Sequence, residues 1–264
     1  MGYLNVIFRM IFIIIFSLMN TNMGLSGEIV RLANGEWPPF TSQKLKKFGV
    51  YSDIVSKAFA LEGIEVEYKF FPWARSYYNV KTGTMDGSLT WAPTEEKKRD
   101  VIFSDPVFMH KKVIFHLKAF NFNWNSIKDL KGLNIGATRQ YTYGSVFDNA
   151  AKRGVIHVEY TTNEVMSLKK LFAERVQVFL SDINVGYNLL RSNFTQDKVK
   201  LVTHHKKPIQ ETFTCVILTK KNISKSIHLM KLFNRGLRKL KKQGVYKKTI
   251  EDSRQGEYLL KLSK

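Results

Sequence analysis

Residues 83–106 read GTMDGSLTWAPTEEKKRDVIFSDP and contain two short apolar segments with high strand propensity, at 88–91 and 101–103. A Pro-Thr turn and a charged run over 95–100 separate these two segments. We therefore predict a strand, a polar loop, a short charged helical turn and a second strand. Small molecules bind beside such loops, at the carboxyl ends of strands in open α/β sheets. The stretch thus predicts part of a sheet and one edge of a binding site.

The chain before this stretch predicts a parallel sheet wound with helices. Residues 28–33 form an apolar strand, and residues 64–70 alternate apolar and charged side chains as a half-buried strand does. A helix with Ser52 as its N-cap lies between them, and Pro72 opens another helix at its first turn. The resulting β-α-β-α-β order is typical of an α/β fold with helices packed on the sheet.

The chain after this stretch predicts a second lobe and a return to the first. An apolar strand over 112–118 crosses into the second lobe, and a strand over 212–219 crosses back. Lobe 1 is then discontinuous, and the two connecting strands form a hinge suited to closure around a ligand. The predicted bounds are 27–117 plus 213–264 for lobe 1 and 118–212 for lobe 2.

Further elements follow from periodicity and capping residues. A final helix over 224–243 packs one apolar side inward and ends at Gly244. The remaining expectations are a turn with a Ser126/Asp129 capping box, strands at 133–137, 155–160 and 176–180, a helix ending before Gly154, a helix capped by Asn163 or Thr162, and Ile227, Met230, Phe233, Leu237 and Leu240 on the packed side of the final helix.

Composition places the chain among globular proteins. Apolar residues make up 44% of the sequence, enough for a packed core. The formal net charge of +20 is high, but no zinc-finger, RNP-like or helix-turn-helix pattern accompanies the positive residues. We expect a basic solvated surface and no nucleic-acid partner. The single cysteine, Cys215, lies in the apolar run 213–218 and predicts a packed core thiol.

Residues 1–26 have the pattern of a secretory signal peptide. A continuous apolar run at 11–16 is followed by polar residues and then by Gly24 and Ser26, which fit a signal-peptidase site. The run is shorter than the roughly 20 residues that span a bilayer, and an uncleaved anchor is the alternative. No cysteine lies near this junction, so we expect no lipoprotein anchor. We predict cleavage and export.

The loops at the ends of the first predicted strands carry aromatic side chains. Two prolines stiffen the loop after 28–33 and present Trp37 in a fixed direction. Trp73 and Arg75 lie near the N-terminus of the helix that Pro72 opens, on the same rim. Binding residues often occupy such loops. The alternatives are core packing for both tryptophans and a solvated surface position for Arg75.

A second group of candidates lies in the predicted second lobe. The loop before its first helix contains Arg139, Tyr141 and Thr142, and the free N–H groups and dipole at a helix start attract anions. Thr142 is predicted to cap this helix, Tyr141 to add a stacking surface and Arg139 to add charge, with a solvated Arg139 as the alternative. Asp182 follows the strand 176–180 and either caps the next helix or points into the cleft.

The sequence contains no catalytic or metal-binding motif that we can assign. There is no glycine-rich phosphate loop, HExxH helix, GxSxG elbow or paired-cysteine site. His204 and His205 are adjacent and would point to opposite faces of a strand, so we expect no metal site there. We predict no cofactor, no bound metal and no catalytic residue.

The stretch DGSLTWAPTEEKKRDVIFSDPVF, residues 86–108, resembles the signature of the family 3 extracellular solute-binding proteins. In that family D-(small/apolar)-(T/S)-x-T-x-E-R precedes a V-x-F-S-x-P-(Y/F) run, and the resemblance extends in weaker form over nearly all of the mature chain. Its members are periplasmic receptors of amino-acid-type ABC importers. The resemblance implies a type II periplasmic binding protein fold, in which two α/β lobes are joined by two hinge strands.

Three residues of this sequence match positions that contact the ligand in the family. The aromatic residue of the family's N-x-x-(Y/W)-x-P-F loop stacks on the ligand and matches Trp37. The aspartate that ends a V-x-(A/V)-x-x-x-D run holds the ligand's ammonium group and matches Asp182. A G-V-x-x-G-T-T stretch binds a ligand carboxylate, but only Thr142 matches it, because Gln140-Tyr141 replaces the usual Gly-Thr.

One departure concerns charge. The family's carboxylate-clamping arginine falls at Lys97, and lysine offers a point charge rather than a bidentate fork. This difference argues against a standard α-amino acid as the ligand, although Arg75 or Arg99 could substitute. The complete predicted ligand-binding set is Glu36, Trp37, Trp73, Arg75, Thr90, Trp91, Lys97, Arg139, Tyr141, Thr142 and Asp182.

The resemblance implies a monomeric periplasmic receptor that captures a small polar solute and delivers it to an inner-membrane ABC permease. Two alternatives stay open. One is an enzyme on the same fold, similar to periplasmic cyclohexadienyl dehydratases, which would use Glu36 or Asp182 as an acid or base. The other is a sensory ligand-binding protein related to receptor input domains.

Overall fold

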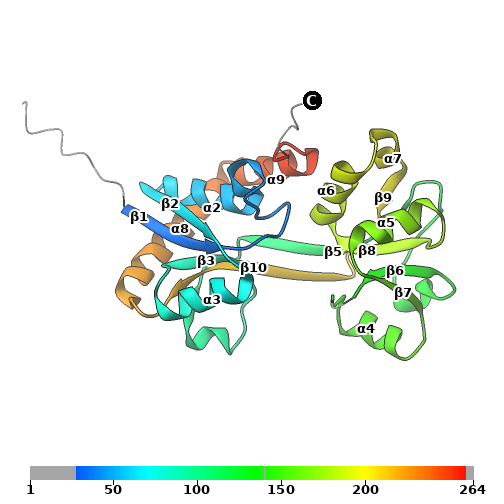
Figure 1. The fold of residues 1–264 in the computed structure, drawn as a ribbon, viewed down its shortest axis with the longest axis horizontal. Coiled ribbons are helices and arrows are strands. Elements are labelled where there is room, and N and C mark those ends of the chain that lie inside the picture. The colour runs from blue at the N-terminus through cyan, green and yellow to red at the C-terminus, as the bar shows by residue number, and fades with distance from the viewer. Residues whose placement is uncertain (1–27, 140, 260–264) are drawn as a thin grey trace, which may run out of the picture.

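Two long antiparallel strands connect the two halves of the molecule. The computed structural model describes residues 28–139 and 141–259. In Figure 1, β5 (Phe108–Leu117) and β10 (Gln210–Thr219) run from one α/β half to the other, and they pair with each other. This arrangement confirms the predicted fold of two α/β lobes joined by two strands. We call the half with β1 to β4 the first lobe and the half with β6 to β9 the second lobe.

The first lobe contains the predicted parallel unit. Strand β1 (Glu28–Asn34) lies between β2 (Ile64–Phe70) and β3 (Gly87–Trp91), all parallel, and β10 pairs antiparallel with β3. Leu32 is fully buried in β1, as expected of a strand covered on both faces. The other elements of this lobe are η1 (Lys46–Phe48), α2 (Val50–Ala60), α3 (Trp73–Thr82), η2 (Lys97–Arg99), β4 (Val101–Phe103), α8 (Ile223–Lys242) and α9 (Val245–Gln255).

The second lobe repeats the parallel arrangement. Strand β6 (Asn134–Thr138) lies between β7 (His157–Thr161) and β8 (Val178–Asp182), and β8 pairs antiparallel with β5. The sheet order is β2-β1-β3-β10-β5-β8-β6-β7. The other elements are η3 (Ile127–Leu130), α4 (Ser145–Lys152), α5 (Glu164–Phe172), α6 (Ile183–Asn193), α7 (Gln196–Leu201) and β9 (Val202–His204).

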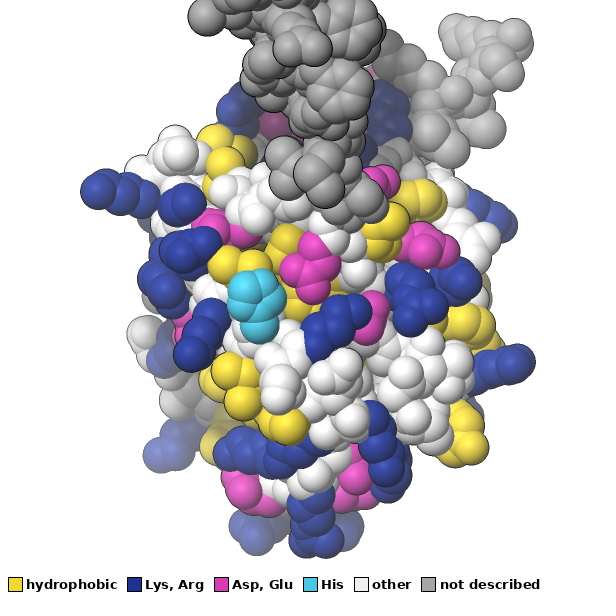
Figure 2. Space-filling model, turned by 90° about the vertical axis from the view of Figure 1, so that its left-hand side faces the viewer, with side chains coloured by type: hydrophobic (Ala, Val, Ile, Leu, Met, Phe, Trp, Pro, Cys, Tyr) yellow, Lys and Arg dark blue, Asp and Glu magenta, His cyan; other side chains and the backbone are white. Residues whose placement is uncertain are grey.

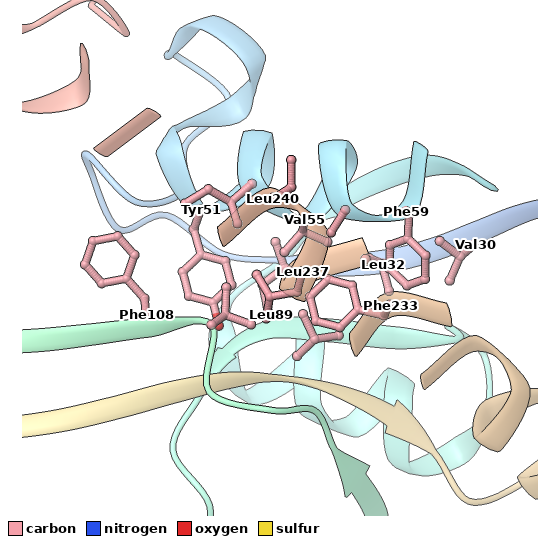
Figure 3. Packing of buried hydrophobic residues seen from close by; sticks show 14 of the residues in the cluster. Val30, Leu32, Tyr51, Val55, Phe59, Leu89, Phe108, Phe233, Leu237 and Leu240 are labelled. Carbon is pink, nitrogen blue, oxygen red and sulfur yellow. The ribbon is translucent and has the colours of Figure 1, made fainter. Parts of the chain in front are cut away.

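The core of the first lobe lies between its sheet and the helices α2 and α8 (Figure 3). Phe233 of α8 and Phe59 of α2 are fully buried, with ring centroids 5.0 Å apart. A Cβ atom at Gly236 would lie only 2.0 Å from the carbonyl oxygen of Ala58, so this glycine lets the two helices approach closely. The apolar stripe predicted on α8 is confirmed except at Ile227, which is 44% exposed.

Positive charge is spread over the surface with carboxylates between. Figure 2 shows the outer end of the first lobe, where Lys and Arg side chains alternate with Asp and Glu. Several cations of the first lobe are paired: Glu62 binds both Arg235 and Lys239, and Lys225 lies 2.9 Å from Asp86. The excess charge is therefore dispersed over this face.

Two predicted helix caps are wrong, and the reason is the same in both. The N-cap residues of α2 and α4 are Gly49 and Gly144, with φ of 97° and 96°, rather than Ser52 and Thr142. A glycine reaches this backbone region at little cost. Ser52 lies inside α2, where its hydroxyl accepts a hydrogen bond from the Asn34 amide and donates one to the Phe48 carbonyl. The predicted Asn163 cap and Ser126/Asp129 capping box are confirmed.

Two further predictions concern the single cysteine and a membrane-spanning segment. Cys215 is 1% exposed, and burial raises its pKa to about 11, so the prediction of a packed core thiol is confirmed. None of the described helices is long and apolar enough to cross a bilayer. The predicted signal peptide, residues 1–26, lies outside the described residues.

Candidate functional site

A cavity of about 510 Å³ lies between the two lobes, where β5 passes from one to the other. Its walls come from loops and strand ends of both lobes, as the crossing strands lead one to expect. The residues that line it are Glu36, Trp37, Trp73, Thr90, Trp91, Lys112, Tyr141, Tyr143, Glu164, Ser181, Asp182 and Val185.

The loop after β1 fixes Trp37 on the wall of the first lobe. The backbone N–H of Trp37 donates to the Thr41 carbonyl at 2.7 Å, and the indole lies 4.7 Å from the buried Phe40 ring. The indole also stacks on His110 of β5, with centroids 4.8 Å apart and an angle of 22°. Glu36 beside it accepts a hydrogen bond from the Gln43 backbone N–H at 3.0 Å. Trp37 therefore joins the first lobe to a connecting strand.

Two further tryptophans complete this wall. Trp73 begins α3, Trp91 ends β3, and their rings are nearly perpendicular at 84° with centroids 5.8 Å apart. A Cβ atom at Gly35 would lie 2.5 Å from the Trp73 ring, so glycine is needed there for the indole to pack. The indole N–H of Trp91 donates to the Ser88 hydroxyl at 2.8 Å. We call Trp37, Trp73 and Trp91 the aromatic wall.

A bulge in β3 aims Trp91 at the cavity. Cys215 and Ile217 of β10 pair with Trp91 and Ser88, so β3 has one extra residue between these pairs. Thr90 lies in the bulge with φ of 63°, a left-handed conformation that is rare for a β-branched residue. Such strained residues cluster at functional sites, which makes Thr90 a candidate on geometric grounds.

The opposite wall contains Asp182, which ends β8 and caps α6. Its Oδ1 accepts hydrogen bonds from the backbone N–H groups of Asn184 at 2.8 Å and Val185 at 3.3 Å. Its Oδ2 is buried without a hydrogen-bond partner among the described residues and lies 3.4 Å from His110 Nδ1. His110 Nε2 lies 3.0 Å from the Thr214 hydroxyl on β10. Both alternatives predicted for Asp182 therefore hold: it caps a helix and it faces the cavity.

Glu164 and Ser181 stand beside Asp182. The Ser181 hydroxyl donates to Glu164 Oε1 at 2.5 Å, and Glu164 is buried, with 7% of the residue exposed. Burial raises the pKa of Glu164 to about 7; the Asp182 charge adds to this rise, and the Ser181 hydrogen bond and Lys112 oppose it. Glu164 is therefore poised to change protonation near neutral pH. We call Glu164, Ser181 and Asp182 the acidic wall.

Lys112 reaches the cavity from β5, directly opposite Asp182 in the strand pairing. Its ammonium group donates to the Thr142 carbonyl and lies 5.3 Å from the centroid of the Tyr143 ring. Burial lowers the pKa of Lys112, and the nearby carboxylates, including Glu164, oppose this shift. The Tyr143 hydroxyl accepts a hydrogen bond from the Thr138 backbone N–H at 2.8 Å, which holds the ring in place.

Most of the residues predicted for the site line this cavity. The structure brings together Glu36, Trp37, Trp73, Thr90, Trp91, Tyr141 and Asp182. Four predicted residues are not among the lining residues. Arg75 lies over the Phe71 ring at 5.7 Å, and Lys97 Nζ lies 5.9 Å from the Trp91 ring centroid. Arg139 and Thr142 are exposed. A ligand-binding role for these four stays a prediction.

Sequence reasoning missed five lining residues: Lys112, Tyr143, Glu164, Ser181 and Val185. Ser181, Glu164 and Tyr143 had a signal, because each is adjacent to a residue already singled out: Asp182, Asn163 and Thr142. Lys112 and Val185 depend on strand register and on the packing of α6, which spacing along the chain does not reveal.

The comparisons with known proteins agree with this geometry. The family profile of the bacterial extracellular solute-binding proteins, family 3, matches residues 29–252. The chain belongs to this family. The match extends over both lobes and both crossing strands, so it confirms the family resemblance predicted from residues 86–108.

Several solved structures share the fold at low sequence identity. Substrate binding domain 2 of Lactococcus lactis GlnP, in an open conformation, is 19% identical, with 90% of this chain and 98% of that chain covered and a TM-score of 0.71. A polar amino acid ABC uptake transporter substrate binding protein from Streptococcus thermophilus is 19% identical, with 87% and 90% covered and a TM-score of 0.69. A histidine kinase sensor domain is 18% identical, with 87% and 96% covered and a TM-score of 0.55. These likenesses show the type II periplasmic binding protein fold.

Proposed function

We propose that this protein is a periplasmic receptor that captures a small polar solute, an amino acid or a related compound, and delivers it to an inner-membrane ABC permease. The observation that carries the proposal is the cavity at the crossing strands, with rings on one wall and charges on the other. Family membership supports binding as the activity, and we assign no catalytic residue. Residues 1–26 would be removed on export, and the mature chain would act as a monomer.

The proposed motion is closure of the two lobes about β5 and β10. We propose lobe bounds of 27–117 plus 213–264 and of 118–212, so both boundaries fall beside or within these strands. A ligand that contacts both walls stabilises the closed state more than the open state, and this difference drives closure. The stacking of Trp37 on His110 supports coupling between the ligand site and the hinge.

Each wall has a proposed task. The aromatic wall supplies ring faces against which the body of the ligand packs. The acidic wall supplies the charge that orients it, with Asp182 and Glu164 as acceptors. Thr90 and Tyr141 would add polar contacts at the rim of the cavity.

A thermal-shift screen of the purified protein tests the proposal. At 100 times its dissociation constant, a ligand stabilises the folded state by about 2.7 kcal/mol. Trp91→Leu should weaken binding of any hit by up to about thirtyfold, because it removes a ring face from the cavity. Tyr78→Leu is the matched control, since Tyr78 is 63% exposed on α3 and lies outside the lining.

The proposal fails in two distinguishable ways. If no amino acid, amine or small organic anion raises the melting temperature, the receptor function itself is contradicted. If a hit binds equally well to the Trp91→Leu and Tyr78→Leu variants, the site is elsewhere.

A further inference from the structure

Carboxylates outnumber cations on the walls of the cavity. Glu36 stands on the wall of the first lobe, and Glu164 and Asp182 stand on the wall of the second. Lys112 is the one cationic side chain among the described lining residues. When the lobes approach each other, carboxylates on the two walls repel each other unless a positive charge lies between them.

Lys112 is already engaged by the protein. Its ammonium group donates to the Thr142 carbonyl and lies over the Tyr143 ring, so two groups of the second lobe hold it at the wall. No arginine is among the described lining residues. Among the described lining residues, a ligand carboxylate would therefore meet neither a guanidinium fork nor an ammonium group without a partner.

Independent evidence for a positive ligand comes from the unmatched acceptor and the rings. Asp182 is 7% exposed and lines the cavity, and its Oδ2 has no hydrogen-bond partner among the described residues. The group that faces Oδ2 within the protein is His110 Nδ1, at 3.4 Å. A buried carboxylate oxygen without a donor is costly, and a ligand N–H group would remove that cost. The tryptophans of the aromatic wall have faces that attract cations, and tryptophan is the strongest of the aromatic residues in this respect.

We propose that the ligand is an organic amine that carries no carboxylate group. The inference rests on the proposed receptor function, because it names the solute that the same cavity would hold. A positive group binds between Glu164 and Asp182, and the carbon chain packs on the aromatic wall. Glu36 on the other wall accepts a second positive group where the ligand has one, which favours diamines over monoamines.

Matched ligand pairs test the proposal with the unmodified protein. Putrescine and ornithine differ only by a carboxylate group, and so do agmatine and arginine. We expect the amine of each pair to bind at least tenfold more tightly by isothermal titration calorimetry, since it loses no free energy on burying an unpaired carboxylate. The proposal is overturned if ornithine and arginine bind as tightly as their amines, or if glutamate or succinate binds in their place.

The two levels of inference fail separately in this experiment. Tight binding of an amino acid or an organic anion overturns the amine proposal and leaves the receptor function standing. Absence of binding across amines, amino acids and anions overturns both.

Variants of the acidic wall sharpen the test. Glu164→Gln keeps an acceptor for the Ser181 hydroxyl but removes the charge, and it should weaken amine binding by about tenfold to a hundredfold. Glu159→Gln is the matched control, because Glu159 pairs with Lys170 on α5 and does not line the cavity. Equal effects of the two substitutions would contradict the proposal.

Lys112→Gln tests the sign of the charge that the cavity prefers. Removing a like charge from the wall should raise amine affinity by about twofold to tenfold. A tenfold loss of affinity would instead show that Lys112 holds an anionic part of the ligand, which would overturn the proposal. Melting curves of the unliganded variants check that each one folds.

Discussion

The two walls of the cavity are built in different ways. On the first lobe, Trp37 follows β1, Trp73 begins α3 and Trp91 ends β3, so all three belong to the same parallel unit. On the second lobe, Glu164 and Asp182 come from α5 and β8 and meet Lys112 of β5. The first wall provides contact area with little charge, whereas the second provides charge that only tertiary packing brings together. The comparison predicts that substitutions on the two walls change ligand binding in different ways.

The largest expected effect comes from removing charge from the second wall at Asp182. Asp182→Ala should weaken ligand binding at least a hundredfold, because it deletes the buried carboxylate that faces the cavity. It should also lower the free energy of unfolding by about 1 kcal/mol, since Oδ1 caps α6. Titration calorimetry and chemical denaturation measure the two effects.

Asp182→Asn separates the two roles of this residue. Asparagine is a good N-cap, so this variant should keep the wild-type stability to within a few tenths of a kcal/mol and still lose most of the binding. If Asp182→Asn binds like the wild type, the charge of the second wall is not what selects the ligand.

The next largest effect concerns pH. In the folded protein the pKa of Glu164 is about 7, so this carboxyl group keeps its proton up to about pH 7. In the unfolded chain its pKa has the ordinary value of 4.5, and the proton is released near pH 4.5. The stability contributed by this group is therefore complete below pH 4.5 and is lost as pH rises through 7. Glu164→Gln should be more stable than the wild type by about 1–3 kcal/mol at pH 8, and the difference should disappear at pH 4.

Ligand affinity should change with pH in the opposite direction to the free energy of unfolding. A cation favours the ionised form of Glu164, so affinity for an amine should rise by up to about tenfold from pH 6 to pH 8 in the wild type. The slope should be flatter in Glu164→Gln. The titratable or charged groups that face Glu164 are Asp182 on β8, Lys112 on β5, and Tyr141 and Tyr143 in the loop before α4. An unchanged slope in the variant would assign the pH dependence to one of these groups.

The smallest expected effect tests the bulge on the first wall. Thr90 has φ of 63°, and asparagine adopts this conformation more readily than a β-branched residue does. Thr90→Asn should therefore raise the free energy of unfolding by about 0.5–1 kcal/mol. A melting curve with no increase would show that the hydrogen bond from Thr90 Oγ1 to the Leu89 carbonyl matters more than backbone strain.

Much of the first wall could be predicted from sequence, because local signals determine it. Strand periodicity places β1, β2 and β3, and Trp37 and Trp91 follow from the loops at their ends. The paired glycine N-caps, Gly49 and Gly144, were not predicted, because nothing in the sequence distinguishes a capping glycine from a loop glycine there. The same limit explains the wrong caps at Ser52 and Thr142.

The second wall was predicted only in part, because it depends on contacts that are remote in sequence. Asp182 was identified, but Lys112 becomes its neighbour only through the antiparallel register of β5 and β8.

Helix α9 was not predicted, since it is mostly polar and buries only Thr249 and Ser253. Its apolar residue Tyr246 packs against the core that α8 completes.

The pairing of Gly87 with Leu218 has a consequence for how the chain reaches its native state. The sheet that begins at the N-terminus stays incomplete until the ribosome has made almost the whole polypeptide, whereas residues 118–212 can form their contacts earlier. Pairing between strands that are far apart in the sequence slows folding. A nascent molecule of this kind therefore remains unfolded longer on its N-terminal side.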